Sequence, residues 1–242
     1  MLVLCFDTET TGLPPKGSFP AKVGADYPYI VQLSFVVFDT ETKTVVQEEN
    51  HLVKVPVKVN GSQAAAIHKI TDEALSAKGV EFAYVYYIFQ AVLGRVDLVV
   101  GHNIEFDLNM MRAQCARHNF PFCVPKNIFC TMKSTIDLCA IRRQNSRGAY
   151  NKYPSLLELY RFLFQEEPTE LHNAIVDVYA CLRCFVQVHL GEACAPEIVA
   201  RISTAREGAS QPNAACAEYL SEAHDFAIKC VPVHVGHDHP DV

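Results

Sequence analysis

Short apolar segments and polar turns alternate over the first part of the chain. Leu2–Phe6 is an unbroken apolar run, which predicts a buried central strand. Tyr29–Phe38 and Thr44–Val55 are rich in β-branched and aromatic residues, and the polar segment Asp39–Lys43 between them predicts a hairpin. Pro14–Pro28 contains Pro, Gly, Lys and Ser without periodicity and is expected to be a loop.

Apolar residues recur at helical spacing further along the chain. A helix is expected after Ser62, which is a favourable N-cap, and another over Leu156–Phe164, which Ser155 caps. Further helices are expected over Glu81–Leu93, Glu105–His118 and about Asn173–His189, with a strand at Asp97–Gly101. Strands that alternate with helices after an opening three-strand meander indicate a mixed α/β sheet.

The later segments are more polar. Arg142–Lys152 is basic and is expected to be a loop. Beyond Gly191 the sequence is rich in Ala and Glu, which predicts two short helices, and Val233–Val242 predicts a frayed tail. We therefore expect one domain over residues 1–190 and a C-terminal extension over residues 191–242.

The composition is that of a soluble globular protein, because half of the 242 residues are hydrophobic and a fifth are charged. No apolar run reaches the roughly 18 residues that a membrane span needs. The formal net charge of −6 argues against a protein that coats nucleic acid by bulk electrostatics. An enzyme that holds only a few nucleotides is still compatible with this charge, since bound metal ions would supply positive charge locally.

The ten cysteines are scattered, and only Cys181 and Cys184 have the CxxC spacing. On a helix these two residues share a face, so core packing explains them better than a zinc site. The start of the chain, Met1–Phe6, lacks the basic residues of a secretory signal. Free thiols without a signal peptide indicate a reducing compartment, so we expect an intracellular protein, cytoplasmic or nuclear, that has no membrane partner.

Two carboxylates, Asp7 and Glu9, follow the first apolar run one residue apart. Side chains alternate along a strand, so both point to one side while Thr8 points to the other. Carboxylates this close repel each other unless a cation lies between them, and a divalent ion with oxygen ligands is the usual solution. For so short a motif, an ordinary strand end remains an equal alternative.

Further candidates lie where later strands meet helices. Asp107 is expected in the first turn of a helix, where it either faces a ligand or only complements the helix dipole. His172 and Asp177 are five residues apart, so they can meet only if His172 precedes the helix and Asn173 caps it. Taken alone, His172 fits an ordinary hydrogen-bonded histidine better, since His is common near helix starts. Together, four carboxylates and one histidine are the groups that two-metal hydrolysis of a phosphodiester requires.

The motifs that contain these residues resemble those of the DnaQ-like 3′ to 5′ exonucleases with an Asp-Glu-Asp-Asp tetrad and a catalytic histidine. Phe6–Gly12 resembles the first motif, His102–Asp107 the second and His172–Asp177 the third, in the right order. The resemblance covers roughly residues 2–190, and the chain is similar to the proofreading epsilon subunit of bacterial DNA polymerase III and its free-standing relatives. It implies a ribonuclease H-like fold, with a five-stranded mixed sheet flanked by helices.

The resemblance also implies the roles of the site residues. Asp7, Glu9 and Asp177 would hold one Mg²⁺ or Mn²⁺ ion, Asp7 would bridge to a second ion, and Asp107 would act through water or as an outer ligand. His172 would take the proton from the attacking water, releasing a nucleoside 5′-monophosphate. The residues that match contacts to the terminal nucleotide are Thr10, Leu13, Ile67, His68 and Phe106. Lys69 departs from the pattern, in which Gly follows the histidine, and weakens the assignment of His68.

The implied function is a metal-dependent 3′ to 5′ exonuclease that acts on the 3′ ends of single-stranded DNA. One alternative is an exoribonuclease of the same fold, because the motifs do not report on the 2′-hydroxyl. Another is an accessory subunit that docks on a polymerase. Arg142–Lys152, with Tyr150 and Tyr153, is either a contact for upstream phosphates and bases or a solvated loop. His234, His237 and His239 fit a tail better than a metal site.

Overall fold

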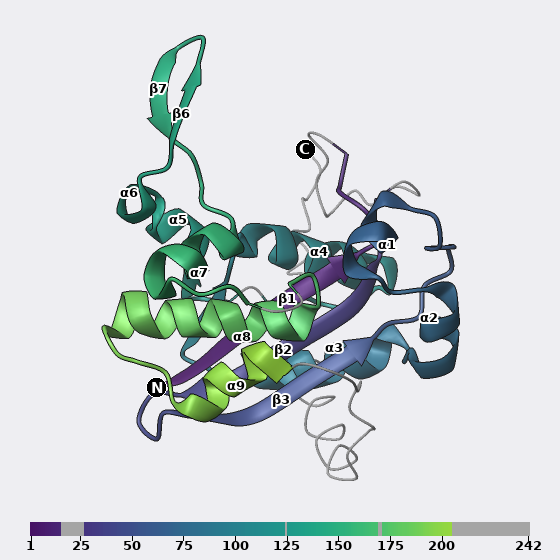
Figure 1. Ribbon diagram of the computed structural model, residues 1–242. Coiled ribbons are helices and arrows are strands. Elements are labelled where there is room, and N and C mark those ends of the chain that lie inside the picture. Colours follow the sequence, from purple (N-terminus) through teal and green to yellow (C-terminus); the bar gives the residue numbers. More distant parts are fainter. Residues whose placement is uncertain (16–26, 124, 169–170, 205–242) are drawn as a thin grey trace, which may run out of the picture.

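The computed structural model describes residues 1–15, 27–123, 125–168 and 171–204. Its centre is a five-stranded sheet in the order β3-β2-β1-β4-β5 (Figure 1). The strands are β1 Leu2–Thr10, β2 Ile30–Asp39, β3 Thr44–Leu52, β4 Leu98–Gly101 and β5 Ile128–Cys130. β2 runs antiparallel to both of its neighbours, β1 and β3, whereas β4 and β5 run parallel to β1, so the predicted five-stranded mixed sheet is confirmed.

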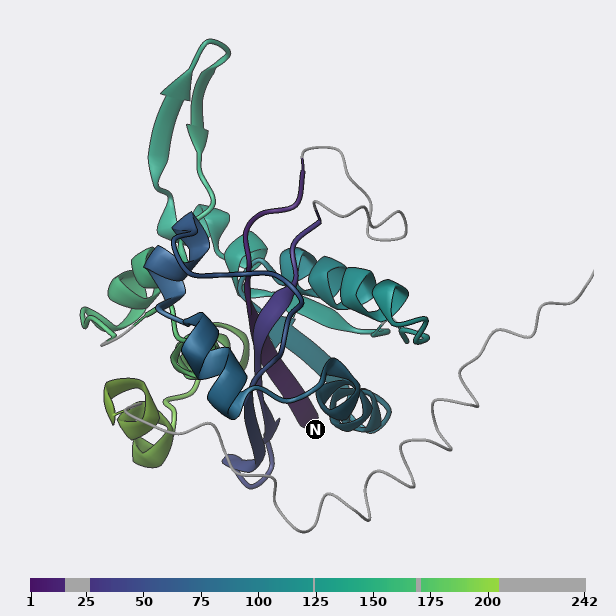
Figure 2. The ribbon, with the colours of Figure 1, turned by 90° about the vertical axis from the view of Figure 1, so that its right-hand side faces the viewer.

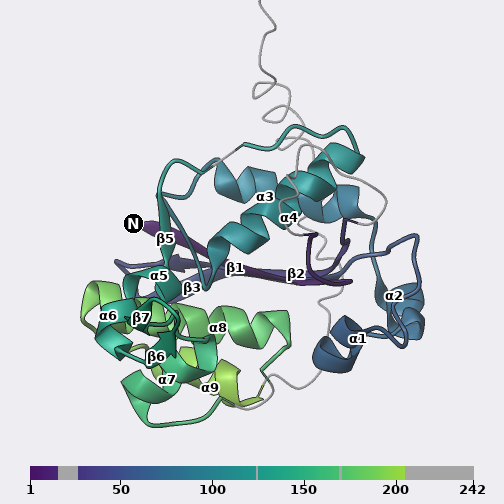
Figure 3. The ribbon, with the colours of Figure 1, turned by 90° about the horizontal axis from the view of Figure 1, so that it is seen from above.

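Helices cover both faces of this sheet, and Figure 3 shows α3 and α4 on one side and α8 with α7 and α9 on the other. The helices are α1 Gln63–His68, α2 Asp72–Lys78, α3 Phe82–Leu93, α4 Ile104–Arg117, α5 Thr131–Ser134, α6 Ile136–Cys139, α7 Leu156–Phe164, α8 Ala174–Phe185, the π-helical η1 Val186–Leu190 and α9 Pro196–Thr204. In the part of the chain that the structure describes, no helix is long and apolar enough to cross a bilayer.

The alternation of side chains along β1 divides the core into two layers. Leu4 and Phe6 pack with α3 and α4, while Val3 and Cys5 pack with α8. Every residue of β1 from Val3 to Phe6 is buried, as expected for a central strand covered on both faces. Asp7 and Glu9 continue the series of Val3 and Cys5, so they lie on the α8 side.

Most predicted helix starts are observed with their caps. Ser62 accepts a hydrogen bond from the Ala65 N–H, and Ser155 forms a full capping box with Glu158. Asn173 caps α8 by accepting from the Ile175 N–H, which leaves His172 outside the helix. Cys181 and Cys184 are buried in α8, in agreement with core packing.

The expected loop over Arg142–Lys152 is wrong, because this segment is a β-hairpin. β6 Arg142–Asn145 pairs with β7 Gly148–Asn151 and with no strand of the main sheet. Figures 1 and 2 show the hairpin projecting from the body of the protein beyond α5, α6 and α7. Its strands bury no apolar face, so the alternation that reveals a strand in a sequence is absent.

The end of the chain is described as far as Thr204. Ile198 and Ile202 of α9 belong to the same core cluster as α8, so the first part of the expected extension packs on the domain. The tail expected over Val233–Val242, with its three histidines, lies outside the described residues. Besides β6 and β7, the structure contains α2, α5, α6 and β5, which the sequence did not predict, and each of these four has seven residues or fewer.

Candidate active site

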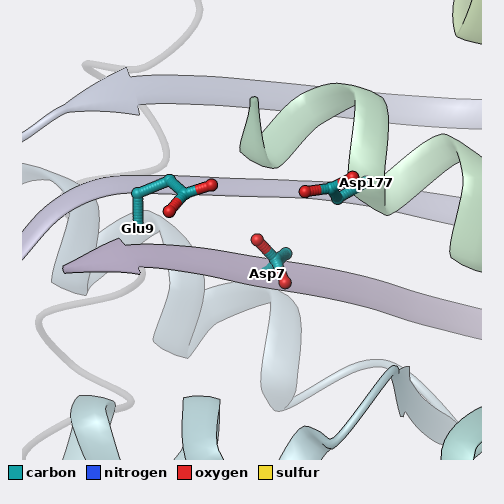
Figure 4. A group of neighbouring side chains, drawn as sticks. All are labelled: Asp7, Glu9 and Asp177. Atoms are coloured by element: carbon teal, nitrogen blue, oxygen red, sulfur yellow. The ribbon is translucent and has the colours of Figure 1, made fainter. Parts of the chain in front are cut away.

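Three carboxylates meet at the end of β1 that faces α8. Figure 4 shows Asp7 and Glu9 on the strand and Asp177 pointing toward them from the helix. One oxygen from each can be chosen so that all three lie within 4.8 Å of one another. These acidic side chains are partly buried, and none forms an ion pair with a Lys or Arg in the described residues.

The electrostatics of this cluster are those of a cation site. Burial raises the pKa of Asp7 to about 7. Burial, and then repulsion from Asp7, Asp177 and Asp107, raises the pKa of Glu9 to about 9. Burial and the charge of Asp7 also raise the pKa of Asp177 well above its ordinary value. A divalent cation would remove this repulsion, and a set of carboxylate oxygens fits Mg²⁺ or Mn²⁺.

Asp107 lies on the opposite side of β1 and outside the group of three. Its Oδ1 accepts hydrogen bonds from the Thr8 N–H at 3.0 Å and the Thr8 hydroxyl at 2.7 Å. Burial, followed by the charge of Asp7, raises the pKa of Asp107 well above its ordinary value. The Asp107 carboxylate therefore interacts electrostatically with Asp7, while Thr8 holds it by hydrogen bonds. This arrangement suits an outer ligand of a metal ion better than a direct one.

The position of Asp107 depends on close packing between β4 and α4. A Cβ added at Gly101 would lie 2.6 Å from Ile104 Cδ1 and 3.1 Å from Ile104 Cβ, so a larger residue would force the Ile104 side chain in the first turn of α4 to shift. Asn103, between them, has φ of +63°. Asp107 then falls in the first turn of the helix, near its positive end.

His172 is exposed and lies just before α8, as its spacing from Asp177 predicts. Its backbone N–H donates to Asp177 Oδ2 at 3.1 Å, and its φ is +77°. Gln32 of β2 donates to Asn173 Oδ1 at 3.4 Å and so ties the start of α8 to the sheet. The backbone of His172 is held in place, and the exposed residue lines a pocket.

The pocket has a volume of about 310 Å³ and contains one acidic edge and one apolar wall. Its lining residues are Asp7, His102, Ser155, Leu156, Leu157, Leu171, His172 and Asp177. The acids and His172 can act on a phosphate, while the leucines can contact a sugar or base. The sequence assigned no role to Leu171, and only the folded chain brings it here.

His102 is the second histidine at the pocket, and it too had no assigned role. Its Nε2 lies 3.1 Å from the Pro154 carbonyl, so this nitrogen carries the proton and donates, and Nδ1 accepts from the Thr131 hydroxyl at 3.0 Å. Burial lowers the pKa of His102 to about 4, so the ring is neutral at physiological pH. The position of His102 directly after β4 was the feature of the sequence that could have indicated a role for it. Its hydrogen bond to Pro154 holds the chain segment that leads into α7.

The residues expected to contact a terminal nucleotide lie outside this pocket. Thr10 is buried and donates to the Gly12 carbonyl at 2.7 Å, and the Thr10 carbonyl lies beside His68. Burial lowers the pKa of His68, and its Nδ1 accepts from the Ile70 N–H. Leu13 and Ile67 are 83% and 53% exposed. Phe106 packs partly on the core.

The pKa shifts predict that the metal-free protein loses stability as the pH rises. In the folded state Asp7 and Glu9 keep protons up to about pH 7 and pH 9, whereas in the unfolded chain they lose them near pH 4. Their stabilising contribution is therefore present below pH 4 and is lost as the pH passes 7 and then 9. We expect the Tm in EDTA to fall by about 5–10 °C between pH 6 and pH 9.

Calorimetric scans with and without Mn²⁺ test this dependence. Added Mn²⁺ should raise the Tm more at pH 9 than at pH 6, because it displaces fewer protons at the higher pH. The matched control is Asp7→Asn, whose Tm in EDTA should change less between pH 6 and pH 9 than that of the wild type. A Tm in EDTA that stays constant or rises from pH 6 to pH 9 would contradict the shifts.

Comparisons with known proteins give one family model and several solved structures of similar fold. Residues 4–185 match the family model described as Exonuclease, RNase_T. Among solved structures, E. coli exonuclease I in complex with a dT13 oligonucleotide has 19% identity and a TM-score of 0.56 over 85% of this chain and 44% of that chain. Its zinc-bound complex with single-stranded DNA has 18% identity and a TM-score of 0.55, with coverages of 81% and 42%.

A third structure is a 3′-exonuclease that recognises the 3′ end of a histone mRNA stem-loop. It has 12% identity and a TM-score of 0.57, over 77% of this chain and 62% of that chain. No curated protein matches the sequence. These structural likenesses establish the fold, and the chain spans less than half the length of exonuclease I.

Proposed function

Because the chain belongs to the exonuclease family, we propose that it is a metal-dependent 3′ to 5′ exonuclease acting on single-stranded DNA. The observation that carries this proposal is the group formed by Asp7, Glu9 and Asp177, with His172 on the same pocket. No cation of the described protein neutralises this group, so the site is suited to bring metal ions and a phosphodiester together. The DNA complex of exonuclease I supports the choice of substrate.

Asp7, Glu9 and Asp177 would hold the metal, and Asp107 would assist from the other side of β1. Bound divalent ions would neutralise the charge of the scissile phosphate and make a water molecule more acidic. The two oxygens of Asp7 allow it to face two ions, as expected of a bridging ligand. Carboxylate donors favour Mg²⁺ or Mn²⁺.

We assign His172 as the general base. Its imidazole is exposed at the pocket, while its backbone is fixed by Asp177, so the ring can turn toward a bound phosphate. It would accept a proton from the water that attacks the phosphorus. The bond from phosphorus to the 3′ oxygen would break and the leaving oxygen would take a proton from water, giving a nucleoside 5′-monophosphate and a strand with a new 3′-hydroxyl.

The terminal nucleotide would rest between the two apolar surfaces of the site. Leu156, Leu157 and Leu171 form the wall of the pocket. Leu13 and Ile67 are exposed apolar side chains and form the second surface. The contact of His68, next to Ile67, with Thr10 places Ile67 near the end of β1. Apolar contact with a sugar and base does not depend on base identity, so the enzyme should not read sequence.

An oligonucleotide assay tests the function. A 5′-fluorescent 20-mer of DNA and the matched RNA are incubated with the full chain in Mg²⁺, Mn²⁺ or EDTA. We expect a ladder of DNA products shortened one nucleotide at a time from the 3′ end, which EDTA abolishes and a 3′-phosphate on the substrate slows. If neither nucleic acid is shortened with either metal, the proposal fails, and a polymerase-docking subunit becomes the better hypothesis.

The same assay decides between DNA and RNA. The structural likeness to a 3′-exonuclease that recognises histone mRNA makes an exoribonuclease the second candidate. Faster shortening of RNA than of DNA would favour that candidate while leaving the roles of the acids unchanged.

A further inference from the structure

The β6–β7 hairpin is unusual because nothing in the described structure packs on its tip. β6 is exposed throughout and β7 at its two central residues. Figures 1 and 2 show the two strands extending away from the rest of the protein as a narrow arm. A two-stranded ribbon without an apolar face contributes little to stability, so packing does not account for it.

The arm is basic in a protein that is acidic as a whole. It contains Arg142, Arg143 and Arg147, and no Asp or Glu occurs from Leu138 to Leu157, although the chain has a formal net charge of −6. Three other arginines of the described chain pair with acids: Arg161 with Glu167, Arg183 with Glu166 and Arg201 with Glu48. None of the three arm arginines forms a salt bridge within the described residues, so their charges are available to a ligand.

The pairing of β6 with β7 places a positively charged side chain beside an aromatic ring. Arg143 lies opposite Tyr150, and directly opposed residues of a ribbon project from the same face. Tyr150 is 43% exposed. Arg142 lies opposite Asn151 on the other face. A guanidinium beside an exposed ring matches a phosphate beside a base, which is how sequence-independent sites hold single strands.

The base of the arm is anchored at the pocket. β7 is followed after three residues by Ser155, which caps α7 and lines the pocket. Lys152 donates its backbone N–H to the Ile141 carbonyl and pairs with Glu158 at 2.6 Å. His102 donates to the Pro154 carbonyl at 3.1 Å. A strand whose 3′ end lies in the pocket therefore has the arm beside its path.

We propose that the β6–β7 hairpin binds the single-stranded part of the substrate upstream of the 3′ end, with Arg142 and Arg143 on phosphates and Tyr150 stacked on a base. This proposal rests on the proposed function, because it takes the pocket as the place where the 3′ end is bound. From its base to its turn the arm extends about five residues, or roughly 16 Å, so it reaches several nucleotides beyond the pocket. Long strands gain affinity from the arm, and very short ones do not.

Binding of 5′-fluorescein dT4 and dT20 in EDTA, measured by anisotropy, tests the arm without hydrolysis. We expect the wild-type chain to prefer dT20 by about tenfold or more, and the triple variant Arg142→Ala/Arg143→Ala/Tyr150→Ala to lose this preference. Removal of two phosphate contacts should also lower the salt slope of dT20 binding by about 1.4. The variant Arg142→Lys/Arg143→Lys keeps the charges and should retain most of the preference.

The matched control is Lys78→Ala/Lys126→Ala, which removes two exposed positive charges from the end of α2 and from a segment before β5. This control should bind dT20 as the wild type does. Equal dT20 affinity of the triple variant and the wild type would overturn the proposal, and so would an equal loss in the lysine control. An arm that increases affinity for a duplex but not for dT20 would also overturn it.

Hydrolysis of dT4 by the wild-type chain in Mg²⁺ separates the two proposals. If dT4 is shortened while dT20 binding is independent of the arm, only the arm proposal fails. If the wild type prefers dT20 through the arm but shortens neither oligonucleotide, the exonuclease proposal fails, and the arm is a nucleic-acid contact with another purpose.

Discussion

Replacing Asp7 by Asn is expected to lower the rate of 3′ shortening by about 10³-fold or more, with no loss of folded stability in EDTA. Asp7 is the centre of the acidic group, because its charge contributes to the raised pKa of Glu9, Asp107 and Asp177. Asn keeps the shape of the side chain but removes that charge. Metal affinity should fall, while repulsion among the remaining acids is relieved.

Three measurements check the Asp7→Asn variant. Single-turnover shortening of a DNA 20-mer gives the rate, calorimetric titration with Mn²⁺ gives metal affinity, and thermal unfolding in EDTA gives stability. The control is Glu41→Gln, whose side chain is 85% exposed in the β2–β3 turn and should behave as the wild type in all three. If Asp7→Asn bound Mn²⁺ as tightly as the wild type, the assignment of this site would be wrong.

Replacing His172 by Asn is expected to lower the rate constant for shortening by about 10²- to 10⁴-fold, while Mn²⁺ affinity stays within a few-fold of the wild type. Asn is the suitable replacement because it tolerates the positive φ of this position, where alanine would be strained. The backbone N–H that donates to Asp177 remains in place. The variant therefore removes the proposed base without removing the support of the metal ligand.

Chemical rescue distinguishes a base from a structural residue. His172→Gly leaves space for a small molecule and also tolerates the positive φ, so added imidazole should restore part of its activity. Imidazole should not restore Asp7→Asn. A His172→Asn variant with the wild-type rate at neutral pH would show that another group accepts the proton.

The parts of the fold that the sequence predicted well are those in which local and tertiary preferences agree. Leu2–Phe6 is apolar because both faces of β1 are covered, and the caps Ser62, Ser155 and Asn173 form hydrogen bonds within a few residues. These features can be recognised in the sequence without knowing which distant residues they contact in the fold. Short elements such as β5, with three residues, carry too little pattern to be recognised.

The β6–β7 hairpin was missed for a different reason. Strands are recognised by an apolar side and a polar side, and this hairpin has no buried side. Gly148, the first residue of β7 after the turn, has φ of +120°, but a single glycine among polar residues is as typical of a loop. Packing does not explain a ribbon with this composition.

The sequence by itself determined the order of the site motifs and the side of the strand on which Asp7 and Glu9 lie, because strand periodicity and the cap at Asn173 are local properties. Only the tertiary structure decided that Asp177 completes their group, that Thr8 holds Asp107 apart from it, and that His102 anchors the base of the hairpin. These contacts join residues that lie 50 or more positions apart in the chain, so they follow from how the sheet and helices pack and from no nearby pattern.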